Sequence, residues 1–388
     1  MVQRSTIPAI VFRIFGCFFV PNFSGESLAQ AKVTWKSFYT CYSLACFIVY
    51  IFAETAFVIR SLDVLRDVSH SFSRSLMLTV HLVVTARITG NLAAMLTGQE
   101  RLLEFFWNSE LFEKTIGLLP RARTVRGKRS KRRWATMRVF LVIFGMALCY
   151  AAGVYYRIGQ IAQSIGAGWV LPVKIIGVFM AAALIVYDSL SYLLLRNSAT
   201  VLAEYIRAQL ETFKECRRSS SFNLQTKVSG QIESIRLNMS KVKKLKESLN
   251  NIWTWPLMVA SASLVIMNCI VFNGIFHDGF KNEIWLSITY ALHASLCFID
   301  LAFVSQALVD EARELKNATL VVPTFEAMED LLHQLRFLHE TIDPDRMCFS
   351  GGGFFSINNS LLVSITGSII VYTVILVQTS DTIDADAA

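Results

Sequence analysis

Seven apolar stretches in this sequence are each long enough to cross a membrane. A helix needs roughly 20 mostly apolar residues to span about 30 Å of hydrocarbon, and lipid offers no partner for a free backbone N–H or C=O group. We therefore predict an all-α fold with seven transmembrane helices. The predicted spans are Phe38 to Ile59, Leu76 to Thr97, Thr136 to Tyr156, Val170 to Leu195, Ile252 to Phe272, Ile284 to Val309 and Phe354 to Gln378.

Composition supports this prediction. Of the 388 residues 54% are hydrophobic and only 17% are charged, which is more apolar surface than a soluble core of this size needs. The surplus apolar surface is expected to face lipid, so membrane lipids are predicted partners.

The 37 Lys and Arg residues are distributed unevenly between the two sides of the predicted membrane. Residues 1–37, 98–135, 196–251 and 310–353 together hold 29 of them, whereas the alternate connections hold four. By the positive-inside rule the amino terminus is predicted to be cytoplasmic and the carboxyl terminus extracellular. The basic run from Arg121 to Arg133 is first a signal for topology and lipid headgroups. A nucleic-acid partner is not predicted.

The first 37 residues raise the question of a cleaved secretory signal, because Ala9 to Val20 is a short apolar run. Arg13 interrupts this run, and cleavage would put the new amino terminus outside, against the charge distribution. We predict a cytoplasmic amino-terminal segment that contains an interfacial helix.

The predicted cytoplasmic connections carry apolar stripes at helical spacing. One continues the fourth span through Leu202 to Phe213, a heptad stripe from Ile232 to Ile252 runs into the fifth span, and a third follows Pro323 and ends near Pro344. These helices either assemble subunits, which we favour for residues 310–353, or pack on one another. Gly351, Gly352 and Gly353 are interpreted as a hinge before the last span.

Sequence patterns for enzymes and metal sites are missing. The eight cysteines lack the paired short spacing of a zinc site, and neither HExxH, GxSxG nor a phosphate-binding glycine loop followed by lysine occurs. We predict a protein that is not an enzyme and needs no cofactor and no metal.

The end of the chain carries a more specific pattern. Tyr372 is followed by five apolar or small residues and then Gln378, and Gly353, Phe355 and Asn358 stand upstream in GFFSINNSLL. These residues resemble the carboxyl-terminal signature of the arthropod gustatory receptor family, TYhhhhhQF with h hydrophobic. The signature's first Thr is Val371 here, and its last Phe is replaced by Thr.

The resemblance implies a chemosensory receptor that acts as a ligand-gated, nonselective cation channel in the plasma membrane of sensory neurons. Related insect olfactory receptors share the expected plan, a tetramer whose last helices line one pore. A homotetramer or a heterotetramer with related receptors, a small-molecule tastant and permeant cations are the partners that the resemblance implies.

One face of the last span fits a pore wall. Ser364, Ser368, Val371, Ile375 and Gln378 recur at steps of four and three, so they share one face of a helix. Val371 and Ile375 would close a pore by dewetting. The alternative is an ordinary packing seam in which Ser and Gln bond neighbouring helices. Residues 379–388 form an acidic tail that is predicted to be extracellular.

The resemblance places a ligand pocket in the outer half of the bundle, among helices two to six. Candidate residues there are polar or aromatic, and the alternative for each is an interfacial or structural role. The candidates are His81, Tyr155, Tyr156, Trp169, Asn273, Trp285, Thr289, Tyr290 and His293.

Charged residues inside spans are costly and call for partners. Arg87 is expected to pair with Asp300 or Glu54, and Asp188 is a further buried acid. The rival functions are a G-protein-coupled receptor, which needs an extracellular amino terminus, and a secondary transporter, for which we find no internal repeat. The sequons at Asn22, Asn238 and Asn317 all fall in predicted cytoplasmic segments and should stay unglycosylated.

Overall fold

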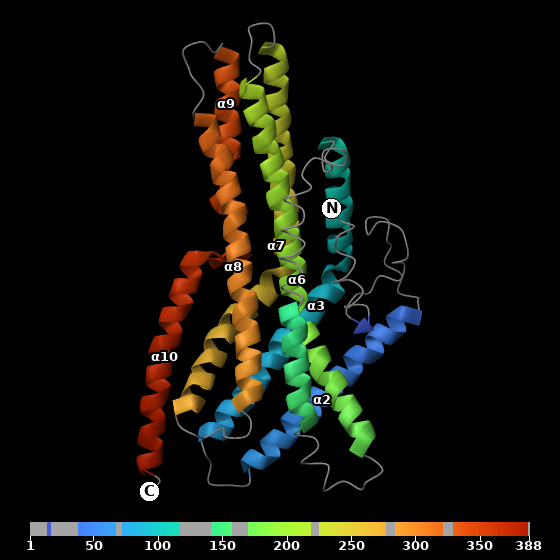
Figure 1. Ribbon diagram of the computed structural model, residues 1–388, viewed down its shortest axis with the longest axis vertical. Helices are drawn as coiled ribbons and strands as arrows, with labels where there is room; N and C mark the ends of the chain where they lie inside the picture. Colours follow the sequence, from blue (N-terminus) through green and yellow to red (C-terminus); the bar gives the residue numbers. More distant parts are fainter. Residues whose placement is uncertain are drawn as a thin grey trace.

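The protein is a bundle of long helices in the computed structural model (Figure 1). The structure describes residues 14–16, 38–66, 72–116, 141–156, 170–218, 225–276, 284–320 and 329–386. The regular elements are the helices α2 (Phe38–Arg66), α3 (Phe72–Ile116), α6 (Val170–Arg218), α7 (Gln225–Phe276), α8 (Ile284–Leu320), α9 (Glu329–Thr341) and α10 (Asn359–Asp386), the 3-10 turn η7 (Asp345–Met347), and the strands β1 (Ser350–Gly351) and β2 (Phe355–Ser356).

Apolar helices occur at every predicted span. Within the described residues, five helices are long and apolar enough to cross a membrane, in α3, α6, α7, α8 and α10. Shorter apolar helical segments, Phe38–Phe52 and Leu141–Tyr156, fall on the first and third predicted spans. The sequence thus predicted the helical class of the fold correctly.

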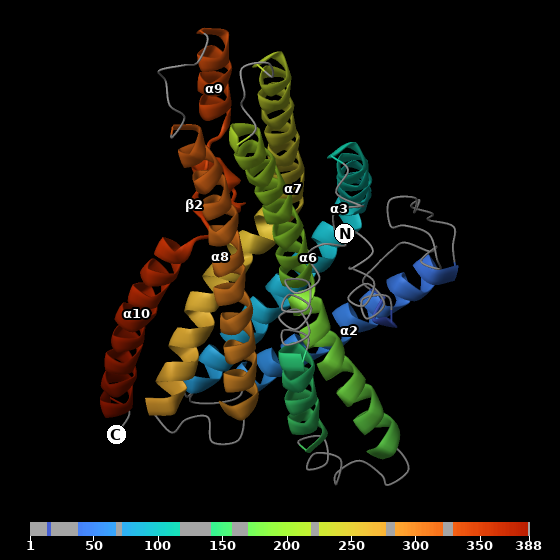
Figure 2. The same cartoon turned by 45° about the horizontal axis from the view of Figure 1, so that its top comes forward.

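Several helices are much longer than the predicted apolar spans that they contain. α6, α7 and α8 run on together past the apolar part of the bundle, and α9 lies beside them at the same end (Figures 1 and 2). The predicted stripes explain why, since Leu202 to Phe213 of α6 and Ile232 to Ile252 of α7 supply residues that are buried between these helices. These two stripes therefore pack on one another within one chain, and subunit assembly through residues 310–353 stays a prediction.

Ion pairs connect α6 with α8 along this extension. Arg207 pairs with Glu311, and Lys214 Nζ lies 2.8 Å from Glu314 Oε1. Nearer the apolar bundle, Asp300 Oδ2 accepts hydrogen bonds from Tyr192 Oη at 2.7 Å and Arg196 Nε at 2.6 Å. These contacts fix the register of α8 on α6.

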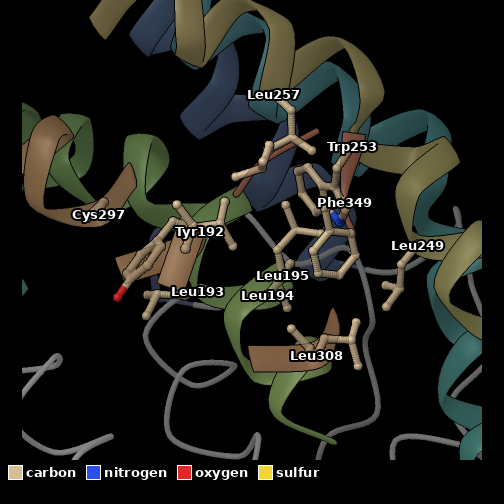
Figure 3. Packing of buried hydrophobic residues seen from close by; sticks show 14 of the residues in the cluster. Tyr192, Leu193, Leu194, Leu195, Leu249, Trp253, Leu257, Cys297, Leu308 and Phe349 are labelled. Atoms are coloured by element: carbon tan, nitrogen blue, oxygen red, sulfur yellow. The ribbon is translucent and has the colours of Figure 1, made fainter. Parts of the chain in front are cut away.

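A large apolar core lies where the extension meets the bundle. Trp253 of α7 and Phe349, from the segment just before β1, are both 0% exposed and lie close together among leucines of α6, α7 and α8 (Figure 3). This packing carries the segment after α9 back into the centre of the molecule.

A tight hairpin then leads into α10. β1 and β2 pair antiparallel, with Gly351 opposite Phe355, and Gly352 and Gly353 between them have φ angles of 62° and 79°. Asn358 Oδ1 accepts a hydrogen bond from the Leu361 N–H at 3.0 Å, which caps the helix. The last span therefore begins at Asn359 rather than at Phe354, because the preceding apolar residues form the hairpin. The helix continues through Asp386, whereas its apolar span ends at Thr379, one residue after the predicted end at Gln378.

Several predicted features lie outside the described residues. These are the interfacial helix apart from residues 14–16, the basic run from Arg121 to Arg133, Trp169, and the first part of the helix after Pro323. The side chains of Glu54 and of the acidic tail also lie outside them.

Candidate functional site

A buried polar cluster lies where α3, α6, α7 and α8 meet. Arg87 Nε of α3 is 2.5 Å from Asp188 Oδ1 of α6, and the two side chains are 6% and 0% exposed. His293 of α8 adds Nε2 at 3.6 Å from the second Asp188 oxygen and 3.0 Å from Ser189 Oγ. Three helices thus contribute to one polar centre inside an apolar bundle, and α7 adds Ser263 as the fourth.

Further contacts tie the cluster to its surroundings. Arg87 Nη1 donates to Ser263 Oγ of α7 at 3.5 Å, and Asn91 Nδ2 donates to the backbone carbonyls of Tyr187 and Asp188 at 3.1 and 3.2 Å. Tyr290, one helical turn before His293, is 3% exposed and is close enough to interact with the Asp188 and Arg87 charges.

The cluster is costly to bury, so its integrity depends on pairing. Each ion loses several kcal/mol of hydration when it leaves water, and the attraction between the ions offsets this cost only while both are present. In a membrane protein such groups commonly mark sites of function. The Arg87–Asp188 pair is therefore both a structural constraint and a candidate site.

The structure corrects the expected charge pairing. Arg87 pairs with Asp188 and not with Asp300, whose partner is Arg196. The reason is geometric, because α3 and α6 bring Arg87 and Asp188 to the same depth, while Asp300 lies nearer the extension of α6. A single sequence does not reveal which helices touch, so the acids could be found but not assigned.

The predicted ligand residues fall into two groups. Tyr290 and His293 join the cluster, and Asn273 is also buried, at 2% exposed. No described contact links the other candidates to the cluster. Trp285 and Tyr156 are 73% and 71% exposed, and His81 is half-buried. Lys174 Nζ lies 4.5 Å from the centroid of the Tyr155 ring, and Thr289 Oγ1 donates to the Trp285 carbonyl. Sequence analysis missed Asn91, Ser189 and Ser263, which carry no signal beyond a polar residue in a span.

Helix α10 has a packed face and open faces. Ile365 and Thr373 are buried, and the Cys269 thiol of α7 contacts the Ile369 carbonyl at 3.6 Å. In the apolar 18-residue stretch of α10 only 11% of residues are buried, against 78% in the corresponding stretch of α6. α10 therefore lies along the outside of the bundle (Figures 1 and 2).

The predicted pore residues lie away from the packed face. Ser364, Val371, Ile375 and Gln378 are exposed in the single chain, and Ser368 is half-buried. A different open face carries Val363, Ile370 and Val374, all more than half exposed. One chain thus leaves two sides of this helix to be covered by lipid, water or other copies.

The signature residues upstream of α10 have local structural roles. Gly353 supplies a positive φ in the turn, Asn358 caps the helix, and the Phe355 ring lies over Gly351, where an added Cβ would be 2.3 Å from Cζ. Tyr372 is 55% exposed on α10. Among the described residues no group of three or more His, Cys, Asp or Glu side chains could hold a metal ion.

Comparison with known proteins identifies relatives along almost the whole chain. The family model described as 7tm Chemosensory receptor matches residues 10–383. No curated protein sequence matches the chain.

Two solved structures share the fold. The insect olfactory receptor OR5 from Machilis hrabei in complex with eugenol superposes with a TM-score of 0.76 at 12% sequence identity, covering 97% of this chain and 98% of that one. The same receptor in a second structure gives a TM-score of 0.74 at 12% identity with the same coverage.

Proposed function

This chain belongs to the 7tm chemosensory receptor family, and on that premise we propose that it is a gustatory receptor acting as a ligand-gated, nonselective cation channel. The resemblance of its carboxyl end to a chemosensory signature is confirmed at the level of the family. The family is one of receptors, in agreement with the expectation that the chain is not an enzyme. The gustatory assignment rests on Tyr372, Gln378 and the residues around Asn358.

The observation that carries the channel proposal is the open surface of α10. This helix is apolar enough to span a membrane, yet only 11% of the residues in its apolar 18-residue stretch are buried in one chain. In the row of Ser364, Ser368 and Gln378, the two serine hydroxyls donate to backbone carbonyls of their own helix at 3.2 and 3.0 Å. A water-filled pore would also solvate the hydroxyl lone pairs and the Gln378 amide, which lipid would not. Assembly into a tetramer, as a homomer or with related receptors, would place four such rows around one axis.

The proposed gate consists of the two apolar residues in this row, Val371 and Ile375. Val371 and Ile375 are 57% and 49% exposed and follow the two serines along the helix. Rings of such side chains can close a narrow pore by excluding water. Ligand binding would open the channel by moving α10 so that this ring widens.

The proposed ligand is a small molecule that enters between the helices in their outer half. Tyr290, His293 and Asn273 are the candidate residues that the fold places inside the bundle. The remaining described candidates, His81, Tyr155, Tyr156, Trp285 and Thr289, would line the entry path, and Trp169 stays a candidate from the sequence alone. The eugenol complex of the olfactory receptor OR5 is consistent with a small-molecule ligand for this fold.

The proposed orientation has a cytoplasmic amino terminus and seven spans, in the plasma membrane of sensory neurons. Its support is the location of 29 of the 37 basic residues on one side. A G-protein-coupled receptor needs the reverse orientation. A tag before Met1 should be stained only after permeabilisation and a tag after Ala388 without it, and the opposite pattern would exclude this channel topology.

The function is tested by patch-clamp recording of the expressed chain, alone and with related receptors, against sugars and bitter compounds. We expect ligand-evoked unitary cation currents. A second-messenger response without such currents would indicate a G-protein-coupled receptor, and saturating flux at fixed stoichiometry would indicate a transporter.

The pore assignment has a matched pair of variants. Ile375 and Ile370 are both exposed and lie about 140° apart around the helix, given 100° per residue. Ile375→Ser should raise the current without ligand, because a hydroxyl ring no longer excludes water. Ile370→Ser should leave that current unchanged. Equal effects of the two variants would contradict the proposed pore face.

A further inference from the structure

The hairpin before α10 is held by side chains from two other helices. Asn250 of α7 uses both ends of its amide on one residue, since Oδ1 accepts from the Ser350 N–H at 2.8 Å and Nδ2 donates to Ser350 Oγ at 3.2 Å. Ser305 of α8, which is 0% exposed, accepts from the Phe349 N–H at 3.1 Å. We call Asn250, Ser305, Phe349 and Ser350 the hairpin clamp.

The clamp fixes the start of α10 closely. The Ile357 N–H donates to the Phe349 carbonyl at 2.8 Å, and Cys348 Sγ contacts the Ile357 carbonyl at 3.1 Å. The cap residue Asn358 follows immediately. These bonds hold Phe349 at a fixed position relative to the first turn of α10. A movement of the clamp must therefore also move the amino-terminal end of α10.

The clamp partner α7 also reaches the polar cluster. Ser263 of α7 accepts from Arg87, and Asn250 lies on the same helix nearer its other end. Pro256 stands between them and lacks an N–H, so the helix has lost one backbone hydrogen bond at this point and can bend there. One helix thus joins the candidate ligand region to the start of α10, and Pro256 lies between the two contacts.

We propose that Asn250 is a positioning residue for gating, which couples movement of α7 to the start of α10 through the hairpin clamp. The proposal rests on the channel function above. Trp253 of α7 packs close to Phe349 of the clamp, so α7 and the hairpin move as one body while the clamp is intact (Figure 3). Loss of the Asn250 amide would let α7 move without carrying the start of α10 along, although the middle of α10 still packs on α7 near Cys269.

The variants follow from the two hydrogen bonds. Asn250→Ala removes both and leaves the Ser350 N–H without its acceptor. Asn250→Asp keeps an acceptor for that N–H, and the Ser350 hydroxyl can reverse its role and donate. Asn251 is the same residue type, adjacent and exposed, so Asn251→Ala is the matched control. Ser305→Ala tests the second arm if Asn250→Ala does not assemble.

The first readout is the ligand-evoked current per channel at the cell surface. Asn250→Ala should lower the maximal open probability about fivefold, the factor that one net buried hydrogen bond corresponds to, with unchanged unitary conductance. Asn250→Asp should recover most of it, and Asn251→Ala should match the wild type. A structural role alone would reduce the number of surface channels and leave the current per channel unaltered.

The second readout does not depend on channel activity. Cys348 is 4% exposed, and burial raises the pKa of its thiol, so it should react slowly with an alkylating reagent. Mass spectrometry should show faster alkylation of Cys348 in Asn250→Ala and an unchanged rate in Asn251→Ala.

The two readouts separate the possible failures. An unchanged Cys348 rate would overturn the clamp, and a faster rate with wild-type current per channel would overturn its role in gating. If no ligand evokes a current from the wild-type chain, the proposed function and the gating role both fail. The alkylation rates of Cys348 would still decide whether the clamp exists.

Discussion

Arg87 of α3 and Asp188 of α6 form an ion pair at 2.5 Å in which both side chains are buried. Arg87→Ala leaves the Asp188 carboxylate uncompensated in an apolar bundle, and a broken buried pair costs about 3–5 kcal/mol. We expect a strong loss of thermal stability in the detergent-solubilised receptor, measured by fluorescence-detected size-exclusion chromatography after heating.

An exposed pair supplies the control for this prediction. Lys114 and Glu110 of α3 are 2.9 Å apart, with side chains 61% and 23% exposed, and such a helical pair contributes about 0.3–0.5 kcal/mol. The Lys114→Ala variant should therefore have a melting temperature close to that of the wild type. The double variant Arg87→Asp with Asp188→Arg should recover part of the lost stability. Similar melting temperatures for all variants would show that the Arg87–Asp188 pair does not stabilise the fold.

Periodic patterns made the helices predictable from the sequence. The stripe from Ile232 to Ile252 keeps steps of three and four residues, and each of its predicted members is buried. Such a pattern is local, so it needs no knowledge of the partner. What the stripe packs against is a property of the whole fold, so the sequence alone did not show that this stripe packs on α6 within the chain.

The candidate site was only partly predictable for the same reason. Tyr290 and His293 could be found as polar residues in a span, but Asp188 became their neighbour only when α6 and α8 were placed side by side. The three glycines from Gly351 were interpreted as a hinge, whereas Asn250, 100 residues before Ser350, holds this turn in place. A contact at that separation leaves no trace in one sequence.

The sequons give a test of orientation that the structure sharpens. Asn238 is buried in α7 and donates to Gln209 Oε1 at 3.1 Å, so it should carry no sugar on either side of the membrane. Asn317 is exposed near the end of α8, and only a cytoplasmic location would keep it unmodified. We expect both tryptic peptides to be unmodified by mass spectrometry.

A positive control for this test lies in the predicted extracellular connection between α7 and α8. Ile284→Thr completes a glycosylation sequon that starts at Asn282, because a threonine would then stand two residues after this asparagine. Asn282 of this variant should be glycosylated, and the variant should lose mass on treatment with an amidase that removes N-linked sugar. Sugar on Asn317 and none on Asn282 would reverse the topology.

Lys246 is a buried cation in the extension of α7. Burial lowers the pKa of its ammonium group, and its side chain is among the buried residues at 6% exposed. Lys246→Met keeps the length of the side chain and removes the desolvation penalty, so we expect a higher melting temperature. Lys244→Met, at an exposed position two residues away, should have little effect.

The pH dependence of this gain has a definite sign. The folded state binds the lysine proton less tightly than the unfolded state, so wild-type stability rises with pH from the lowered pKa up to the ordinary value of 10.5. The advantage of Lys246→Met should therefore be largest at neutral pH and should shrink as the pH approaches 10.5. A constant advantage across this range would show that packing, rather than charge, is responsible.

Gly351 is required by the aromatic ring above it. A Cβ at this position would lie 2.3 Å from Phe355 Cζ, so Gly351→Ala must displace the ring and open the hairpin. We expect a loss of stability of about 1–3 kcal/mol, typical of overpacking, and partial recovery when Phe355→Leu is added. Gly230→Ala is the control, because an added Cβ meets nothing within 4 Å there and Ala in a helix interior is favoured over Gly by roughly 0.5–1 kcal/mol. The two alanine substitutions should thus shift the melting temperature in opposite directions, and a rise for both would mean that Phe355 does not pack on Gly351.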